Sequence, residues 1–402
     1  MSNYWKYYDE NFDWKIEPNI NPDFAYTIKR LKEHGLSEID SINLFNSGYV
    51  CFEDNDVLID RFYGGHLSSY DMITRFSLDQ AKEILKKVPS SKCSVYKVKS
   101  VEELKALIDT ISVKERSVVF RGQNQNHFVE RPIRNPFLTI KDFGEVSLLP
   151  SLWRKMYNVN PQSFAGFITL SLMEWSNIFY SAFDLEEIER RHNALIASGE
   201  QIYTMFEMKE CSDDLLREFG KYRLDMSMGM NYNLATTLTT LLQHYGLYSP
   251  VLDLTESLEV ALFFATHKYK ISNSISSYDF IGTNNKQSVI YALRLDKNEM
   301  ERHNERNEFL KYLEPLRPIK QKCVVCSTNQ YSINLPALYL EKVIILDFNI
   351  MENISGISTE DIFPHMGNDK FLKAIYDKLH KKNAVTIFDN KINPSSIDMK
   401  SI

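Results

Sequence analysis

The chain has 402 residues, 44% of them hydrophobic and 25% charged, which is typical of a globular protein with one large or two to three ordinary domains. A formal net charge of −6 argues against a general nucleic-acid binder, but it does not exclude a local basic groove. The low content of Gly and Pro, 14 and 13 residues, argues against long disordered stretches.

The compartment is predicted from what the sequence lacks. The first residues have neither the charged region nor the apolar stretch of a signal peptide, and no run of about 18 apolar residues predicts a membrane span. Five cysteines fit a reducing cytoplasm. Cys323 and Cys326 form a lone CxxC without a second pair or a nearby His, so we expect buried strand thiols rather than a metal or redox site. No metal is expected.

Residues 1–93 are predicted to form a small N-terminal α+β extension. Residues 49–52 and 57–59 are apolar runs around an Asp-Asn-Asp turn, which favours a hairpin, and residues 78–87 favour a helix. The extension carries no catalytic signature. We expect a structural role, with specificity or partner binding as the alternative.

A new pattern begins at residue 94. Residues 94–98 read as a strand, and Ser100 with Glu103 forms a capping box before an amphipathic helix. The next strand ends at Arg121, and a polar loop covers residues 123–145.

Hydrophobic patterning predicts the remaining elements. Helices are expected over residues 164–245, ending at Gly246, and over residues 258–269, 296–312 and 370–379. Strands are expected over residues 289–293, 323–326 and 343–346, with a Ser/Asn-rich loop over residues 272–287.

Several motifs place polar residues at the ends of apolar elements, where ligand sites are usually built. They are Phe120-Arg121-Gly122-Gln123, the block Gln243-His244-Tyr245-Gly246 with Asp253-x-Thr255 and Ala261-Leu262-Phe263-Phe264-Ala265, and Arg317-Pro318-x-x-Gln321. Together they resemble the FRG domain, a bacterial module, from about residue 94 to residue 379. We therefore predict an FRG-like domain over residues 94–402, with a helical insertion at about 155–245 and a C-terminal helix and tail at about 351–402.

The sequence departs from the usual FRG block in two places. Tyr245 stands where a second His is common, and residues 248–251 read Tyr-Ser-Pro-Val where Pro-Thr-Arg-Leu is more typical. The missing Arg removes one anion contact.

FRG domains are in turn distantly similar to ADP-ribosyltransferases. This similarity implies an α+β fold with a split β-sheet core and three polar positions around bound NAD, which acts as a substrate. Arg121, Thr255 and Gln321 match these positions in order and are the catalytic candidates. Gln321 is the weakest match, because an amide replaces a carboxylate and cannot act as a base.

The candidates for binding NAD are Arg121, Gly122, Gln123, His244, Tyr245, Asp253 and Thr255. Arg121 suits the diphosphate, because a guanidinium binds phosphate oxygens bidentately, and its alternative is an ion pair with Asp253. Thr255 either orients the ribose or caps the following helix, a role that Ser257 can also fill. Tyr245 and His244 either contact nicotinamide and ribose or pack at a helix end.

Three functions remain open at this point. The first is an NAD-dependent ADP-ribosyltransferase-like enzyme, a toxin or anti-phage effector with RNA or protein as acceptor and an antitoxin or regulatory protein as partner. The second is a non-catalytic module that senses a nucleotide or a partner. The third is an NAD glycohydrolase. No membrane partner is expected.

Overall fold

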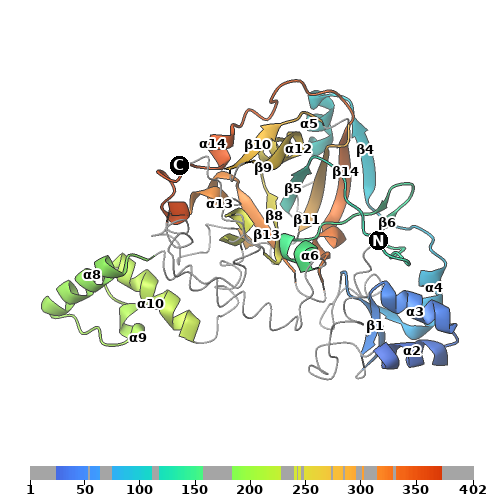
Figure 1. The fold of residues 1–402 in the computed structure, drawn as a ribbon, viewed down its shortest axis with the longest axis horizontal. Coiled ribbons are helices and arrows are strands. Elements are labelled where there is room, and N and C mark those ends of the chain that lie inside the picture. The colour runs from blue at the N-terminus through green and yellow to red at the C-terminus, as the bar shows by residue number, and fades with distance from the viewer. Residues whose placement is uncertain are drawn as a thin grey trace.

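The computed structural model describes residues 24–52, 55–63, 75–110, 117–156, 183–227, 240–241, 243–245, 249–272, 275–283, 286–295, 301–302, 315–328 and 332–373. These residues form a mixed α+β fold, which confirms the predicted class. A seven-stranded sheet lies at the centre, with a small α+β unit at one end and a group of helices projecting at the other (Figure 1).

The N-terminal unit is a three-stranded antiparallel sheet packed against two helices, α2 and α3. The predicted hairpin is confirmed, because Tyr49 pairs with Asp60 and Cys51 with Leu58. The predicted helix after it is confirmed as a 3-10 turn that continues into a short α-helix. The elements are α2 (Phe24–Glu33), α3 (Glu38–Asn46), β1 (Tyr49–Phe52), β2 (Asn55–Asp60), β3 (Arg75–Ser77), η1 (Leu78–Gln80) and α4 (Ala81–Leu85).

The central sheet has the strand order β12-β13-β8-β5-β11-β14-β4. Only the edge pair of β14 and β4 is parallel, and the other pairs are antiparallel. The strands are β4 (Ser94–Val98), β5 (Ser117–Gln123), β8 (Val251–Thr255), β11 (Val289–Leu295), β12 (Glu301–Arg302), β13 (Cys323–Ser327) and β14 (Leu340–Leu346).

Alternating residues of these strands build two cores on opposite faces. On one face, Phe120 and Ile290 pack against α12 (Leu258–Thr266) and α5 (Val101–Asp109). On the other, Val119 and Tyr291 pack with the segment that enters α6 (Ser151–Met156). Because strand side chains alternate, Arg121 falls on the second face and Gly122 on the face covered by α12.

The two helices on the first face begin as their sequences predict. The Ser100 hydroxyl accepts a hydrogen bond from the Glu103 amide at the start of α5, and Ser257 accepts one from Val260 at the start of α12. Glu103 bonds back to the Lys99 amide, one residue before the cap.

Helices dominate the described part of residues 164–245, as expected. They are α8 (Leu185–Ala197), α9 (Met205–Met208) and α10 (Asp214–Ser227), and they form the projecting group in Figure 1. Residues 240–241 and 243–244 are also helical, whereas Gly246 lies outside the described residues. The remaining described elements are β6 (Thr139–Ile140), β7 (Gly144–Glu145), α13 (Leu316–Lys320), η3 (Leu335–Tyr339) and α14 (Thr359–Ile362).

Three expectations about segments after residue 258 are wrong in part. The helix predicted to reach residue 269 ends at Thr266, and the Ser/Asn-rich loop contains a strand: β9 (His267–Ser272) and β10 (Ile275–Phe280) form a hairpin. Tyr278 stabilises this hairpin by packing on Phe263, which a polar composition does not reveal. In the charged stretch 296–312, the described residues 301–302 form strand β12 rather than a helix, because they pair with β13.

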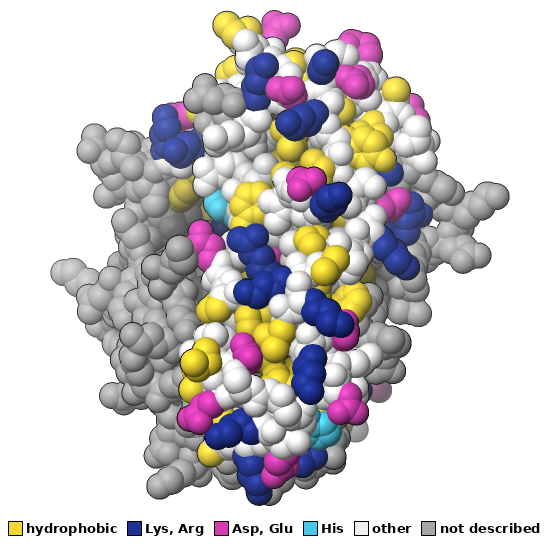
Figure 2. Space-filling model, turned by 90° about the vertical axis from the view of Figure 1, so that its right-hand side faces the viewer, with side chains coloured by type: hydrophobic (Ala, Val, Ile, Leu, Met, Phe, Trp, Pro, Cys, Tyr) yellow, Lys and Arg dark blue, Asp and Glu magenta, His cyan; other side chains and the backbone are white. Residues whose placement is uncertain are grey.

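One side of the molecule carries β4 and the N-terminal unit (Figure 1). On this face, Lys and Arg side chains alternate with Asp and Glu and with hydrophobic side chains (Figure 2). Neither charge sign dominates it, in keeping with the small net charge of −6. No helix among the described residues is long and apolar enough to span a membrane.

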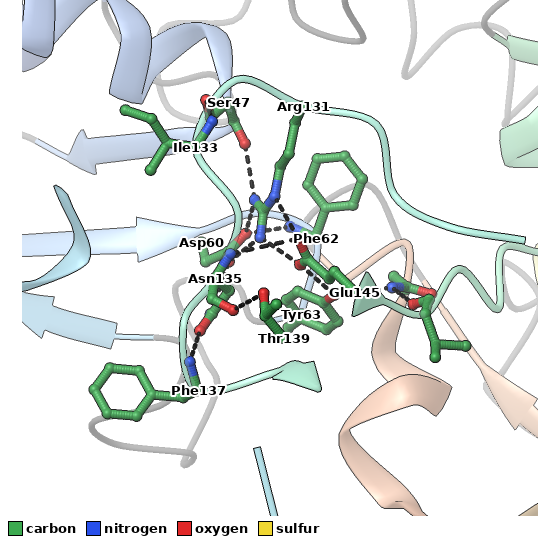
Figure 3. Close-up of polar contacts among 12 residues, drawn as sticks. Ser47, Asp60, Phe62, Tyr63, Arg131, Ile133, Asn135, Phe137, Thr139 and Glu145 are labelled. Atoms are coloured by element: carbon green, nitrogen blue, oxygen red, sulfur yellow. Dashed lines mark hydrogen bonds and ion pairs between the residues drawn. The ribbon is translucent and has the colours of Figure 1, made fainter. Parts of the chain in front are cut away.

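A buried ionic cluster joins the N-terminal unit to the loop that precedes α6 (Figure 3). The Arg131 guanidinium donates to both carboxylate oxygens of Asp60, at 2.9 and 2.8 Å, and to both of Glu145, at 3.2 and 2.6 Å. All three side chains are at most 1% exposed. The Tyr63 hydroxyl also donates to Glu145.

Sequence patterning did not single out this cluster, because Arg131 and its hydrogen-bond partners lie up to 84 residues apart in the chain. Burial raises the pKa of Glu145 above its ordinary value, although the charge of Arg131 opposes the shift. The loop that we predicted to be merely polar therefore docks the N-terminal unit through a buried charge network.

Candidate functional site

Among the described strands of the central sheet, the pairing between β5 and β8 is the shortest. These neighbouring strands share a single residue pair, Phe120 with Thr255. Beyond that pair, the Arg121 side chain bridges the two strands: its Nη1 donates to the main-chain oxygen and to Oδ1 of Asp253, both at 2.7 Å. The ion pair with Asp253, the alternative to diphosphate binding for Arg121, is therefore present, and it links β5 to β8.

The Asp253 carboxylate is held from a second side by the helical segment before residue 246. Gln243 Nε2 donates to Asp253 Oδ1 at 3.2 Å, and Ser151 Oγ donates to Gln243 Oε1 at 2.9 Å. The Ser249 amide in turn donates to Ser151 Oγ at 3.0 Å. This chain of bonds joins α6, the end of that helical segment and β8.

Two opposing effects set the pKa of Asp253. Burial raises it, but the charge and hydrogen bond of Arg121 outweigh burial and leave the pKa below its ordinary value. The carboxylate is thus an anion at neutral pH. The side chains of Arg121 and Asp253 are 14% and 22% exposed, so the pair is only partly screened by water. Within the described residues, the Nε of Arg121 has no hydrogen-bond partner.

Gly122 has a packing role. A Cβ added to it would lie 1.7 Å from the Ala261 main-chain oxygen of α12, so only glycine lets β5 approach this helix. Gln123 ends β5 and pairs with Val289, and its Oε1 is buried without a partner in the described chain.

His244 is a buried neutral imidazole. Its Nε2 lies 2.8 Å from Cys323 Sγ, and the ring also hydrogen-bonds the Gln321 side chain. Burial lowers its pKa to about 4, and the Asp253 charge only partly opposes the shift. Burial also raises the pKa of the Cys323 thiol, so this contact joins a neutral ring to a thiol rather than forming a reactive ion pair.

The two thiols of the CxxC segment are buried on β13, as expected from the sequence. Across the described residues, no group of His, Cys, Asp and Glu is arranged to hold a metal ion.

Tyr245 points into the protein. It is fully buried, its hydroxyl donates to Asp369 Oδ2 at 2.6 Å, and its ring meets Phe371 edge-on at 4.9 Å. This placement corresponds to the packing alternative for Tyr245, because the ring has no exposed face on which a nicotinamide can stack.

Thr255 and Gln321 lie side by side, and the side chain of each hydrogen-bonds a main-chain carbonyl. The Thr255 hydroxyl donates to the Gln321 carbonyl at 2.7 Å and accepts from the Ser257 amide at 3.0 Å. Gln321 Nε2 donates to the Ile362 carbonyl at 3.0 Å. Ser257, rather than Thr255, is the N-cap of α12. The structure thus brings the two candidates together but gives each a positioning role.

The three catalytic candidates come from three adjacent strands or their ends. Thr255 on β8 pairs with Phe120 of β5 on one side and with Cys323 of β13 on the other. Arg121 follows Phe120 directly, and Gln321 precedes Cys323 by two residues. The backbone positions of all three therefore lie at one end of the β13-β8-β5 segment, but Thr255 pairs with Phe120 and so faces α12, whereas Arg121 starts on the opposite face and reaches Asp253.

Four neighbouring residues were given no role by the sequence analysis. Tyr278 stacks on Phe363 with ring centres 4.6 Å apart, and Arg317 lies over the Phe363 ring at 5.4 Å. Asp369 accepts the Tyr245 hydroxyl bond. Arg317 stood within a quoted motif, which was the available signal, whereas Tyr278 lay in a segment predicted to be a loop.

The comparison with known families supports the resemblance drawn from the motifs. A family model for the FRG domain matches residues 186–274. The FRG match includes the segment with Gln243, Asp253, Thr255 and α12, whereas Arg121 and Gln321 lie outside it. No curated protein and no solved structure matches the chain.

Proposed function

We propose that this FRG-like protein is an NAD-dependent ADP-ribosyltransferase-like enzyme. The observation that carries the proposal is the placement of Arg121, Thr255 and Gln321 at one end of three adjacent strands, where the Arg121–Asp253 ion pair links β5 to β8. ADP-ribosyltransferases, which FRG domains resemble distantly, have a split sheet with three polar positions in this order.

The geometry supports a different role for each of the candidate residues Arg121 and Asp253. Arg121 has a buried Nε without a described partner, and a guanidinium suits the diphosphate of NAD. Asp253 is the carboxylate beside it, and its lowered pKa keeps it ionised. We assign Asp253, rather than Gln321, to stabilise the positive charge that develops on the ribose as nicotinamide leaves.

Thr255 and Gln321 contribute indirectly in this proposal. Their hydrogen bonds to main-chain groups hold the end of β8 against the turn before β13. Gln123 is assigned to contact the substrate through its unpartnered Oε1. Gly122 allows α12 to pack directly against β5, and His244 and Tyr245 support the surrounding packing.

The acceptor and the biological partner are proposals from the sequence resemblance. An RNA or protein acceptor, an antitoxin or regulatory partner, a cytoplasmic location and a role as toxin or anti-phage effector all fit an ADP-ribosyltransferase. The mixed charges on the face in Figure 2 offer no uniformly basic surface for RNA there.

Nicotinamide release from NAD, measured with and without cellular RNA or protein, tests the proposal. Arg121→Gln should lower release at least tenfold while the protein stays folded. Arg294→Gln is the matched control, because Arg294 forms a comparable ion pair with Glu341 near the other end of the β5–β11 ladder. If neither acceptor yields nicotinamide above background and NAD leaves the melting temperature unchanged, the transferase proposal is wrong.

A non-catalytic nucleotide-binding module is the second candidate. Two observations favour it: the third position holds an amide, Gln321, instead of a carboxylate, and the side chains of Thr255 and Gln321 already hydrogen-bond main-chain carbonyls. NAD or ADP-ribose binding without nicotinamide release identifies this function. Nicotinamide release that needs no acceptor identifies an NAD glycohydrolase.

A further inference from the structure

Arg317 is a buried cation with unused hydrogen-bonding capacity. It lies in the first turn of α13 and is 2% exposed. Its guanidinium carbon lies 5.1 Å from the centre of the Tyr245 ring and 5.4 Å from that of Phe363. Nη1 donates to the His244 carbonyl at 3.3 Å, whereas Nε and Nη2 have no partner in the described part of the chain.

No described carboxylate forms an ion pair with this guanidinium. Burial raises the pKa of Asp369 and the charge of Arg317 opposes the shift, but among the described residues no hydrogen bond or ion pair joins the two side chains. Oδ2 accepts the Tyr245 hydroxyl bond and Oδ1 accepts the Leu372 amide. Buried charges are normally paired and buried donors normally bonded, so two nitrogens without a partner on a buried guanidinium indicate a missing anionic acceptor.

Arg317 also lies next to the Arg121 site. Two consecutive residues, Gln243 and His244, connect the two arginines. The Gln243 side chain donates to Asp253, the ion-pair partner of Arg121, and the His244 carbonyl accepts a hydrogen bond from Arg317. Tyr278 stacks on Phe363. Burial raises the pKa of its hydroxyl, and the charges of Asp253, Arg317 and Arg121 also shift it, so all three charged groups lie within electrostatic range of Tyr278.

We propose that Arg317 and Arg121 together bind the diphosphate of the dinucleotide, with Arg317 donating through Nε and Nη2. The inference rests on the proposed function for the identity of the ligand, but the anion site stands on the geometry of Arg317. Guanidinium groups bind phosphate oxygens through parallel N–H donors, and two of them match the two phosphates. The rings of Tyr245 and Phe363 stabilise the cation before the ligand arrives.

The test compares binding of pyrophosphate, ADP-ribose and NAD by calorimetry in the wild type, Arg317→Gln, Arg317→Lys and Arg294→Gln. Arg317→Gln should weaken binding of all three ligands at least tenfold. Arg317→Lys should restore part of the loss, because it keeps the charge but not the planar pair of donors. Arg294→Gln should bind as the wild type does.

The outcomes separate this inference from the proposed function. If Arg317→Gln binds all ligands as the wild type does while Arg121→Gln loses them, the inference is wrong and the proposed function stands. If Arg317→Gln loses pyrophosphate and ADP-ribose while the wild type releases no nicotinamide, the anion site stands and the transferase falls. Wild-type protein that binds neither pyrophosphate nor ADP-ribose overturns the inference.

A second measurement covers the case in which Arg317→Gln does not fold. Wild-type crystals soaked with pyrophosphate should show phosphate density within hydrogen-bond distance of Nε and Nη2 of Arg317. Density that is absent there overturns the inference.

Discussion

The glycine of the Phe-Arg-Gly motif provides a sharp test of how the site is built. In Gly122→Ala, the new Cβ would lie 1.7 Å from the Ala261 oxygen, 2.7 Å from the Ala261 carbonyl carbon and 2.9 Å from the Ala265 nitrogen. All three obstacles are main-chain atoms of α12. A rotamer change cannot relieve the clash, so β5 and α12 must separate.

The size of that movement sets the expected cost. Real Cβ contacts essentially never fall below 3.0 Å, so the strand and the helix must move apart by about 1.3 Å at this point. Overpacking a core costs about 1–3 kcal/mol when side chains can adjust, and here the backbone must yield. We therefore expect a loss of about 3 kcal/mol or more, which lowers the melting midpoint of a chain of this size by roughly 4 °C or more.

Thermal unfolding of Gly122→Ala followed by circular dichroism measures this loss. The matched control is Gly367→Ala, whose Cβ would meet only the ring of His365, at 3.2 Å, and which should melt close to the wild type. If Gly122→Ala melts within roughly 2 °C of the wild type, the packing argument is wrong. Loss of ligand binding with unchanged stability would instead assign Gly122 to direct substrate contact.

Three further predictions concern buried polar groups. Arg131→Met should lower the free energy of unfolding, measured in urea, by about 3–5 kcal/mol, because it leaves two carboxylates buried without their cation. The control Arg294→Met removes a partly exposed ion pair and should lower it by less than about 1 kcal/mol. Equal losses in the two variants would contradict this reasoning. The pKa of His244 is about 4 in the folded protein and 6.5 ordinarily, so the unfolded chain binds the extra proton and stability should fall by on the order of 2–3 kcal/mol as pH drops from 6.5 towards 4. A His244→Gln variant with the same pH slope would rule this out. Gln321→Glu should destabilise by about 3 kcal/mol or more at pH 8 and less at pH 5, because an ionised carboxylate would face the Ile362 carbonyl that now accepts from the amide; melting curves that do not depend on pH would refute it.

Several polar contacts of the candidate site could be predicted from the sequence. An ion pair with Asp253 was the alternative that the sequence left open for Arg121, and the structure contains it. Arg121, Thr255 and Gln321 were grouped by their motifs, and the strand pairing brings them to one end of neighbouring strands. The FRG resemblance, too, was visible in the motifs before the family match.

The orientation of each side chain could not be predicted in the same way. Tyr245 was a candidate for stacking on nicotinamide, but its hydroxyl is bonded to Asp369, 124 residues later in the chain. Thr255 and Gln321 carry chemistry that suits a ribose, yet both bond main-chain carbonyls. Hydroxyl and amide groups accept many partners, so residue type leaves the choice open.

The sequence by itself determined the local features of this protein. Strands such as β11, the caps at Ser100 and Ser257 and the helices of residues 185–227 depend on residues within a few positions of one another, so their patterns are visible along the chain. Tertiary structure alone decided the short pairing of β5 with β8 beside Arg121, the network around Arg131 and the free donors of Arg317. These features depend on which residues, far apart in the sequence, are brought within hydrogen-bond distance by the packing of the whole chain. A pattern that spans only a few neighbouring residues does not contain that information.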